Sequence, residues 1–177
     1  MPALPQIAFM PPLIDATILS LQTRMPDQVA AFNANPANPL DITVPATYHF
    51  GIADEHSLHP FPQIEVAAVE GRFGRWALNH TAADHDPTLN VVIWLQGVTG
   101  QIGPVYRELL GLVQCAIEIL AQPGAFGGEN ELASDNGIYW RLSELIPLET
   151  DDPERQVRTW LVPAFLQCRL EVVEQFG

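Results

Sequence analysis

The sequence predicts an α+β protein, with a mostly antiparallel β-sheet and with a long helix and N-terminal helices packed on one face. Two observations carry this prediction. An apolar run of strand length, residues 91–95, precedes a helix-length stretch after Pro104, whose apolar residues recur every three or four positions. The segments around this pair alternate between apolar and polar residues with the period of two that is typical of strands. Strands grouped in this way, with few helices between them, are typical of the α+β class.

The length and composition favour one folded domain. The chain has 177 residues, of which 47% are apolar and 16% charged, enough to bury a single core. Residues 1–12 are apolar and proline-rich without a positive charge, so they are predicted to be an extended arm and not a signal peptide. Residues 13–177 are expected to form the domain. No stretch reaches the about 18 consecutive apolar residues that indicate a membrane span.

Helical patterns lie on both sides of a proline near the N-terminus. Residues 13–22 place apolar side chains on one helical face. Pro26 is predicted to interrupt this pattern and to open a second short helix that reaches Phe32. A loop follows, and residues 42–44 and 47–50 are candidate edge strands, since flanking prolines limit their length.

Three consecutive strands are expected next, at residues 63–73, 76–82 and 89–96. Short turns join them, which favours an antiparallel meander. The second turn is assigned to residues 84–87, Asp-His-Asp-Pro, because this combination is typical of turns.

The long helix is the clearest element. Pro104 fits its first turn, where a missing N–H is tolerated, and residues 122–124, Gln-Pro-Gly, end it. Its predicted buried stripe consists of Val105, Leu109, Leu112, Val113, Ala116, Ile119 and Leu120.

Two further strands are predicted after this helix. Residues 138–142 form the first. Residues 157–174 form the second, in which apolar side chains alternate from Trp160 to Val172. Pro163 predicts that the middle of this strand is an edge or a bulge.

The charge balance argues against direct nucleic-acid binding. Eight arginines, no lysine and 21 acidic residues give a net charge of −13, whereas duplex binding requires cations that displace phosphate counterions. An acidic surface keeps a protein soluble and also repels DNA that passes nearby. Cys115 and Cys168 have no CxxC or metal-ligand spacing, which favours two buried free thiols over a disulfide.

One cluster contains plausible metal ligands, namely His80, Asp84, His85 and Asp86. A catalytic zinc needs ligands held by rigid elements, as in HExxH on a helix. This spacing falls in a predicted turn, so a solvated turn is favoured and a metal-dependent enzyme is kept as the alternative.

The same two interpretations apply to a second cluster of polar residues. His56 and His59, with Asp54 and Glu55, either bind a cation or form an exposed loop, and the exposed loop is favoured.

Other catalytic motifs are missing from the sequence. There is no GxSxG, and the glycines at 97, 100 and 103 lack the Lys and Ser/Thr of a phosphate-binding loop, which favours a tight turn. The four tryptophans, Trp76, Trp94, Trp140 and Trp160, fall in predicted strands and are interpreted as core or subunit-interface anchors. The sequence predicts no catalytic, cofactor-binding or metal site, and hence no enzyme.

The order of these local features carries a resemblance that spans most of residues 13–174. Its parts are the helix at 13–22, the helical turn at 25–32, the strand entry at 59–66, the strand at 89–94, and the helix with YRELLG at 106–111 that runs into LAQPGAF at 120–126. In this order the chain resembles the tail terminator, or tail completion, proteins of long-tailed bacteriophages.

The resemblance implies a structural virion protein of the tail and neck that is assembled in the host cytoplasm. In that family a small α+β subunit forms a hexameric ring that caps the head-proximal end of the tail tube and stops its polymerisation. The implied partners are further copies of the chain, the tail tube protein and the head-completion (stopper) protein. DNA would pass through the lumen without specific binding, and neither a cofactor nor a membrane is implied.

Two alternatives remain open. The first is another neck or head–tail joining component, and the second is a small metal-dependent enzyme that uses His80, Asp84, His85 and Asp86. The acidic and histidine residues of the predicted loops are candidate partner or lumen contacts: Asp54, Glu55, His56, His59, Asp84, Asp86, Glu129, Glu131, Asp151 and Asp152.

Overall fold

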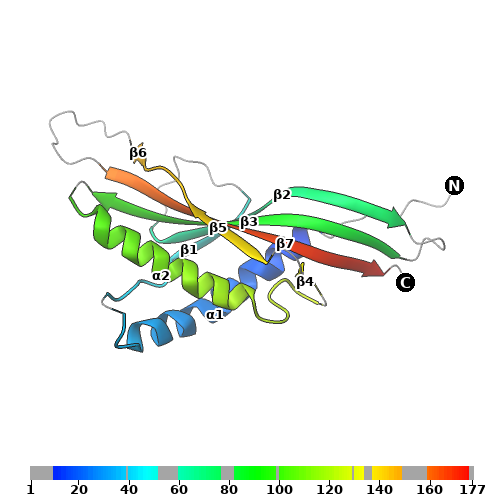
Figure 1. The fold of residues 1–177 in the computed structure, drawn as a ribbon, viewed down its shortest axis with the longest axis horizontal. Coiled ribbons are helices and arrows are strands. Elements are labelled where there is room, and N and C mark those ends of the chain that lie inside the picture. Colours follow the sequence, from blue (N-terminus) through cyan, green and yellow to red (C-terminus); the bar gives the residue numbers. More distant parts are fainter. Residues whose placement is uncertain are drawn as a thin grey trace.

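A twisted β-sheet covered on one face by two helices forms the part of the chain that the computed structural model describes (Figure 1). The structure describes residues 10–38, 40–51, 60–76, 82–98, 100–128, 130–133, 137–148 and 159–175, with the backbone only at 71–76, 82–86 and 172–175. The helices and strands in these ranges are α1 (Met10–Ala34), β1 (Thr47–Phe50), β2 (Gln63–Trp76), β3 (Ala82–Val98), α2 (Ile102–Leu120), β4 (Glu131–Leu132), β5 (Ile138–Leu142), β6 (Ile146–Leu148) and β7 (Thr159–Gln175).

The sheet is mostly antiparallel, which confirms the predicted α+β class. Its strand order is β1-β2-β3-β7, and β4, β5 and β6 each pair with the other side of β7. Every pair is antiparallel except β1 and β2, which run parallel.

The core lies between the sheet and the helices. The predicted stripe of α2 is buried from Leu109 to Leu120, with Val105 packed against it. Strand residues alternate as expected, so every second side chain enters this core along residues 64–66 of β2, 89–95 of β3 and 162–170 of β7. The strand contributions are Ile64, Val66, Leu89, Val91, Ile93, Leu95, Val162, Ala164, Leu166, Cys168 and Leu170. Both cysteines are free and buried, as predicted.

The N-terminal region is one continuous helix, so the predicted break at Pro26 is wrong. Leu21, Met25 and Val29 are all buried on one side of α1. Burying such side chains stabilises the helix by about 1.5–3 kcal/mol each, which together outweighs the roughly 3 kcal/mol penalty of an interior proline. The helix also begins at Met10, so residues 10–12, which were assigned to the arm, are helical.

Two long strands are described between residues 63 and 98, where the sequence predicts three. Of the segment predicted as a strand at 76–82, Trp76 belongs to β2 and Ala82 to β3, and residues 77–81 lie outside the described residues. The predicted turn at 84–87 lies inside β3, where β2 pairs with residues 85–87 and β7 pairs with residues 84 and 85. Only the β3–β7 ladder is interrupted at Asp86 and Pro87, where the proline has no N–H to donate.

Pro163 is buried in an interior strand, which corrects the prediction of an edge or a bulge. It lies opposite Trp94 of β3, and its carbonyl accepts a hydrogen bond from the Ser143 N–H at 3.2 Å. Ser143 lies in the gap between β5 and β6, so the missing proline N–H faces a place where no strand pairs with β7.

Of the two candidate edge strands, only residues 47–50 form one, as β1. Residues 42–44 do not, because the side-chain amide of Asn33 binds both backbone groups of Ile42. The Ile42 N–H donates to Asn33 Oδ1 at 2.8 Å, and Asn33 Nδ2 donates to the Ile42 carbonyl at 3.0 Å. Ile42 is thereby fixed in the core beside α1.

Candidate functional site

Most of the predicted contact residues lie outside the part of the chain that the structure describes. These are Asp54, Glu55, His56, His59, Glu129, Asp151 and Asp152. Asp84, His85 and Asp86 occupy consecutive backbone positions of β3, and Glu131 is exposed in β4. Glu131 lies directly opposite Glu171 of β7, so two like charges face each other at this point.

Metal ligands are not brought together within the described residues. There, no group of three or more His, Cys, Asp or Glu side chains is placed to hold an ion. Of the predicted cluster, His80 and the side chains of residues 84–86 lie outside this description. The metal-dependent alternative therefore stays a prediction.

The sheet has two unlike free edges. On one side, β5 pairs only with β7 among the described strands, and its central residues Tyr139, Trp140 and Arg141 are all exposed. On the other side, β1 covers β2 only as far as Val66, so the outer edge of β2 is open from Ala67 to Trp76 in the described part. Exposed side chains at this edge include Phe50, Val69 and Glu70.

The sheet face away from the helices holds buried polar groups. Gln63 and Glu65 are only 6% and 4% exposed, and their neighbours Ile64 and Val66 point into the helix-covered core. Gln63 Oε1, Asn90 Oδ1 and Trp94 Nε1 are buried without a hydrogen-bond partner in the described residues, as is Thr47 Oγ1. By register, Thr47, Gln63 and Trp94 form one row across β1, β2 and β3. This face therefore carries hydrogen-bonding capacity that the described residues do not use.

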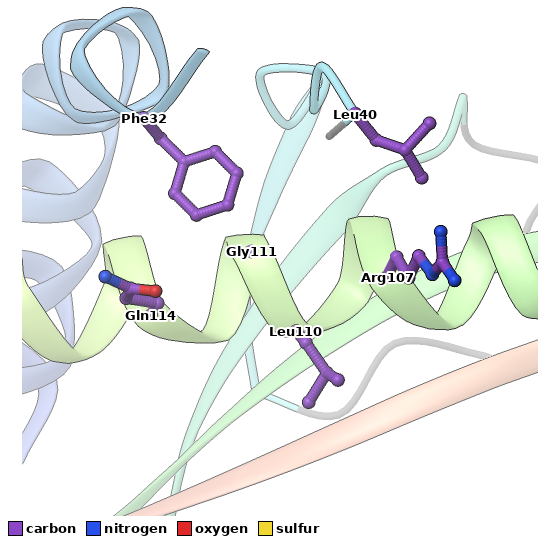
Figure 2. A pocket seen from close by; sticks show the side chains of 6 residues that line it. All are labelled: Phe32, Leu40, Arg107, Leu110, Gly111 and Gln114. Carbon is purple, nitrogen blue, oxygen red and sulfur yellow. The ribbon is translucent and has the colours of Figure 1, made fainter. Parts of the chain in front are cut away.

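A shallow hollow of about 310 Å³ lies between α2 and the end of α1 (Figure 2). Figure 2 shows the Phe32 ring pointing from α1 towards Gly111, with Leu40 further along the same side. Arg107 and Gln114 supply its polar side chains. It contains neither a nucleophile nor an acid–base pair, so this arrangement offers shape for packing and no chemistry for catalysis.

The titratable groups with clear shifts are buried core groups. Burial raises the pKa of Cys168 to about 12, and burial together with the Glu118 carboxylate raises the pKa of Cys115 to about 11. Burial also raises the pKa of Tyr48, which packs against the core, to about 12. All three groups are held neutral, the opposite of an activated thiolate nucleophile.

The sequence pointed to acidic loops, whereas two of the exposed aromatic residues of the described structure, Tyr139 and Trp140, lie together at the edge strand β5. The signal for this edge is short: Tyr, Trp and Arg in succession within one strand, which are residue types enriched in protein interfaces. Of these three, only Trp140 was interpreted from the sequence as a possible interface anchor.

The fold defines the class of the protein: a two-layer α+β domain with a mostly antiparallel sheet. Comparison with known proteins finds no protein family that matches the chain and no curated protein that matches it. Within the described residues, neither helix combines the length and the apolar character needed to cross a membrane.

Proposed function

We propose that the chain is a ring-forming tail terminator of a long-tailed bacteriophage. Its ring caps the head-proximal end of the tail tube, stops tube polymerisation and joins the tube to the head-completion proteins. The role is structural, with no catalytic residue, and DNA passes through the lumen without specific binding. The resemblance of the sequence to this family is one support for the proposal.

The structural observation that supports it most is a ribbon of three strands that continues beyond the helices (Figure 1). The ribbon consists of residues 71–76 of β2, 82–87 of β3 and 171–175 of β7. With 17 residues, β3 spans roughly 56 Å, whereas the 19 residues of α2 span roughly 29 Å. A sheet that extends so far past its helix layer is suited to contact neighbours in an assembly.

The charge of the chain is consistent with a DNA conduit. A subunit of net charge −13 repels a duplex, so the wall of a ring built from it would not retain passing DNA. Asp84 and Asp86 lie at ribbon positions and remain proposed lumen contacts.

The proposal is tested by assembling the tail tube protein with and without this chain. We expect rings in electron micrographs, and tubes that carry a ring at one end and stop growing. An unrelated acidic protein of similar charge serves as the control. Tubes of unchanged length without an end ring would contradict the proposal.

Native mass measured with and without a chelator tests the alternative, since a monomer with one bound metal would favour the metal-dependent enzyme.

A further inference from the structure

The free edge of β5 is rich in the residue types that dominate binding energy in interfaces. Tyr139 is 61% exposed and Trp140 44% exposed, and Arg141 follows them in the same strand. The Arg141 guanidinium lies over the Phe165 ring, 5.3 Å from its centroid, which orients the side chain. Trp, Tyr and Arg are the commonest hot-spot residues, and an uncovered edge strand is a template for pairing with another chain.

The open edge of β2 offers a complementary surface. Ten residues, from Ala67 to Trp76, have no strand on their outer side in the described part of the chain, and β5 needs only five. At the start of this edge Val69 is 47% exposed, and the exposed carboxylate of Glu70 follows it. The β5 edge therefore presents an arginine with two aromatic side chains, whereas the β2 edge presents an acid with an apolar side chain at its start and carries Arg72 and Arg75 further along the strand.

We propose that β5 of one copy adds as a strand to the open edge of β2 in the next copy, with Arg141 beside Glu70. This inference rests on the proposed ring and names the surfaces that build it. The strand directions agree, because three antiparallel steps, from β2 to β3, β7 and β5, make β5 run opposite to β2. A second copy in the same orientation therefore presents its β2 to β5 in the antiparallel sense.

The two edges are different surfaces, so the contact is head-to-tail. Such contacts close into a ring when the rotation between copies permits it, and otherwise continue as a filament. Main-chain hydrogen bonds supply affinity that does not depend on sequence, and the side chains of both edges set the register. The charges favour the register that places Arg141 beside Glu70 over registers that place it beside Arg72 or Arg75 of the same edge.

Charge exchange tests the contact. Arg141→Glu and Glu70→Arg each place like charges together, and each is expected to weaken association of the full chain by about tenfold or more, since like-charge juxtaposition is strongly unfavourable. The two variants mixed in equal amounts pair Arg with Glu at both contacts, and so does the double variant within one chain. Native mass spectrometry is expected to find oligomers restored in both cases, with the two variants alternating in the mixture.

Two matched changes control for charge and folding. Asp27 is an exposed residue of α1, and Asp27→Arg changes the net charge by the same amount as Glu70→Arg. Arg107 is an exposed residue of α2, and Arg107→Glu changes the net charge by the same amount as Arg141→Glu. Both are expected to leave assembly unchanged, and circular dichroism verifies that all the variants fold.

The outcomes separate this inference from the proposed function. Oligomers that survive both single variants, single variants that mixing does not restore, or a wild-type chain that stays monomeric at all concentrations would each overturn the edge-to-edge contact. Tube capping is measured independently, so capping without this contact would retain the proposed function. Assembly through these edges without capping would instead contradict the function and support the contact.

Discussion

Gly111 lies where α2 packs tightly against Phe32 of α1 and against Ile42. A Cβ added there would lie 2.8 Å from Ile42 Cγ2 and 3.0 Å from Phe32 Cζ, both in packed positions. Ala normally stabilises a helix interior by about 1 kcal/mol relative to Gly, but overpacking costs about 1–3 kcal/mol. Gly111→Ala is therefore expected to lower the free energy of unfolding by about 1 kcal/mol in urea titrations. Gly103→Ala is the control, because nothing lies within 4 Å of its Cβ. If Gly111→Ala proves as stable as this control, the packing described for Gly111 is wrong.

The buried thiols predict a loss of stability at high pH. In the unfolded chain they ionise near their ordinary pKa of 9.0, whereas burial raises the pKa of Cys168 to about 12 and that of Cys115 to about 11. Above pH 9 the folded state therefore holds more protons than the unfolded state, so the free energy of unfolding falls as pH rises. The stabilisation by the two neutral thiols is complete below pH 9. It is lost as the pH rises towards their pKa values in the folded state, about 11 for Cys115 and about 12 for Cys168.

We expect a fall of about 1.4 kcal/mol per pH unit and thiol between pH 9 and 11, measured by urea unfolding. Tyr48, whose pKa burial raises to about 12, adds to the fall above pH 10. Cys168→Ala removes one of the titrating groups, so its stability is expected to fall less steeply with pH even though its absolute stability is lower. A flat profile in the wild-type chain would show that the thiols are not buried.

At the scale of an element, α1 shows how burial overrides a local signal. Pro26 is exposed in the interior of the helix, where it supplies no N–H and therefore no hydrogen bond to the preceding turn. Pro26→Ala is expected to raise the free energy of unfolding by about 1–3 kcal/mol, and the melting temperature with it. Pro104→Ala, in the first turn of α2, is expected to change stability little, because that N–H has no partner inside the helix. Equal effects of the two changes would contradict a continuous α1.

The sequence predicts a helix or strand well where one strong hydrophobic pattern determines it. It predicts less well where strands or side chains distant in the sequence determine the local structure. The stripe of α2 and the alternation in β7 are confirmed, since burial on one face imposes a period on the residues themselves. The prediction of a turn at 84–87 is wrong because β2 and β7 both pair with parts of this segment. The prediction for Pro163 is wrong because its missing N–H faces the gap between β5 and β6, so an interior strand tolerates it. Asn33 illustrates the reverse case, in which one distant side chain keeps Ile42 out of a strand.

At the scale of the whole molecule, the two free edges depend on topology and not on local sequence. Among the described strands, β5 is an edge because it pairs only with β7, and β2 keeps an open edge because β1 covers only four of its residues. No periodicity in residues 138–142 or 67–76 contains that information. The sequence alone suggests Trp140 as a core or interface anchor, but it could not propose a contact between Arg141 and Glu70, which is 71 positions away.

Net charge makes the effect of salt on assembly predictable. Two copies of charge −13 whose centres are roughly 30 Å apart repel by about 20 kcal/mol in unscreened water, and this repulsion is largely screened at 0.15 M salt. Salt also weakens the proposed Arg141–Glu70 contact, but one exposed pair contributes only about 0.2–1 kcal/mol. The repulsion between whole subunits is the larger effect, so raising salt from about 0.01 M to 0.15 M is expected to increase the assembled fraction in sedimentation velocity.

Arg141→Gln separates the two effects of salt. This variant lacks the charge of the pair and keeps the repulsion between subunits, so its assembly is expected to rise with salt at least as steeply as that of the wild-type chain. If the assembled fraction of the wild-type chain falls with salt while that of Arg141→Gln does not, complementary edge charges outweigh the net repulsion. The edge contact would then be stronger than one exposed ion pair allows, and further charged residues along β2 and β5 would have to take part in it.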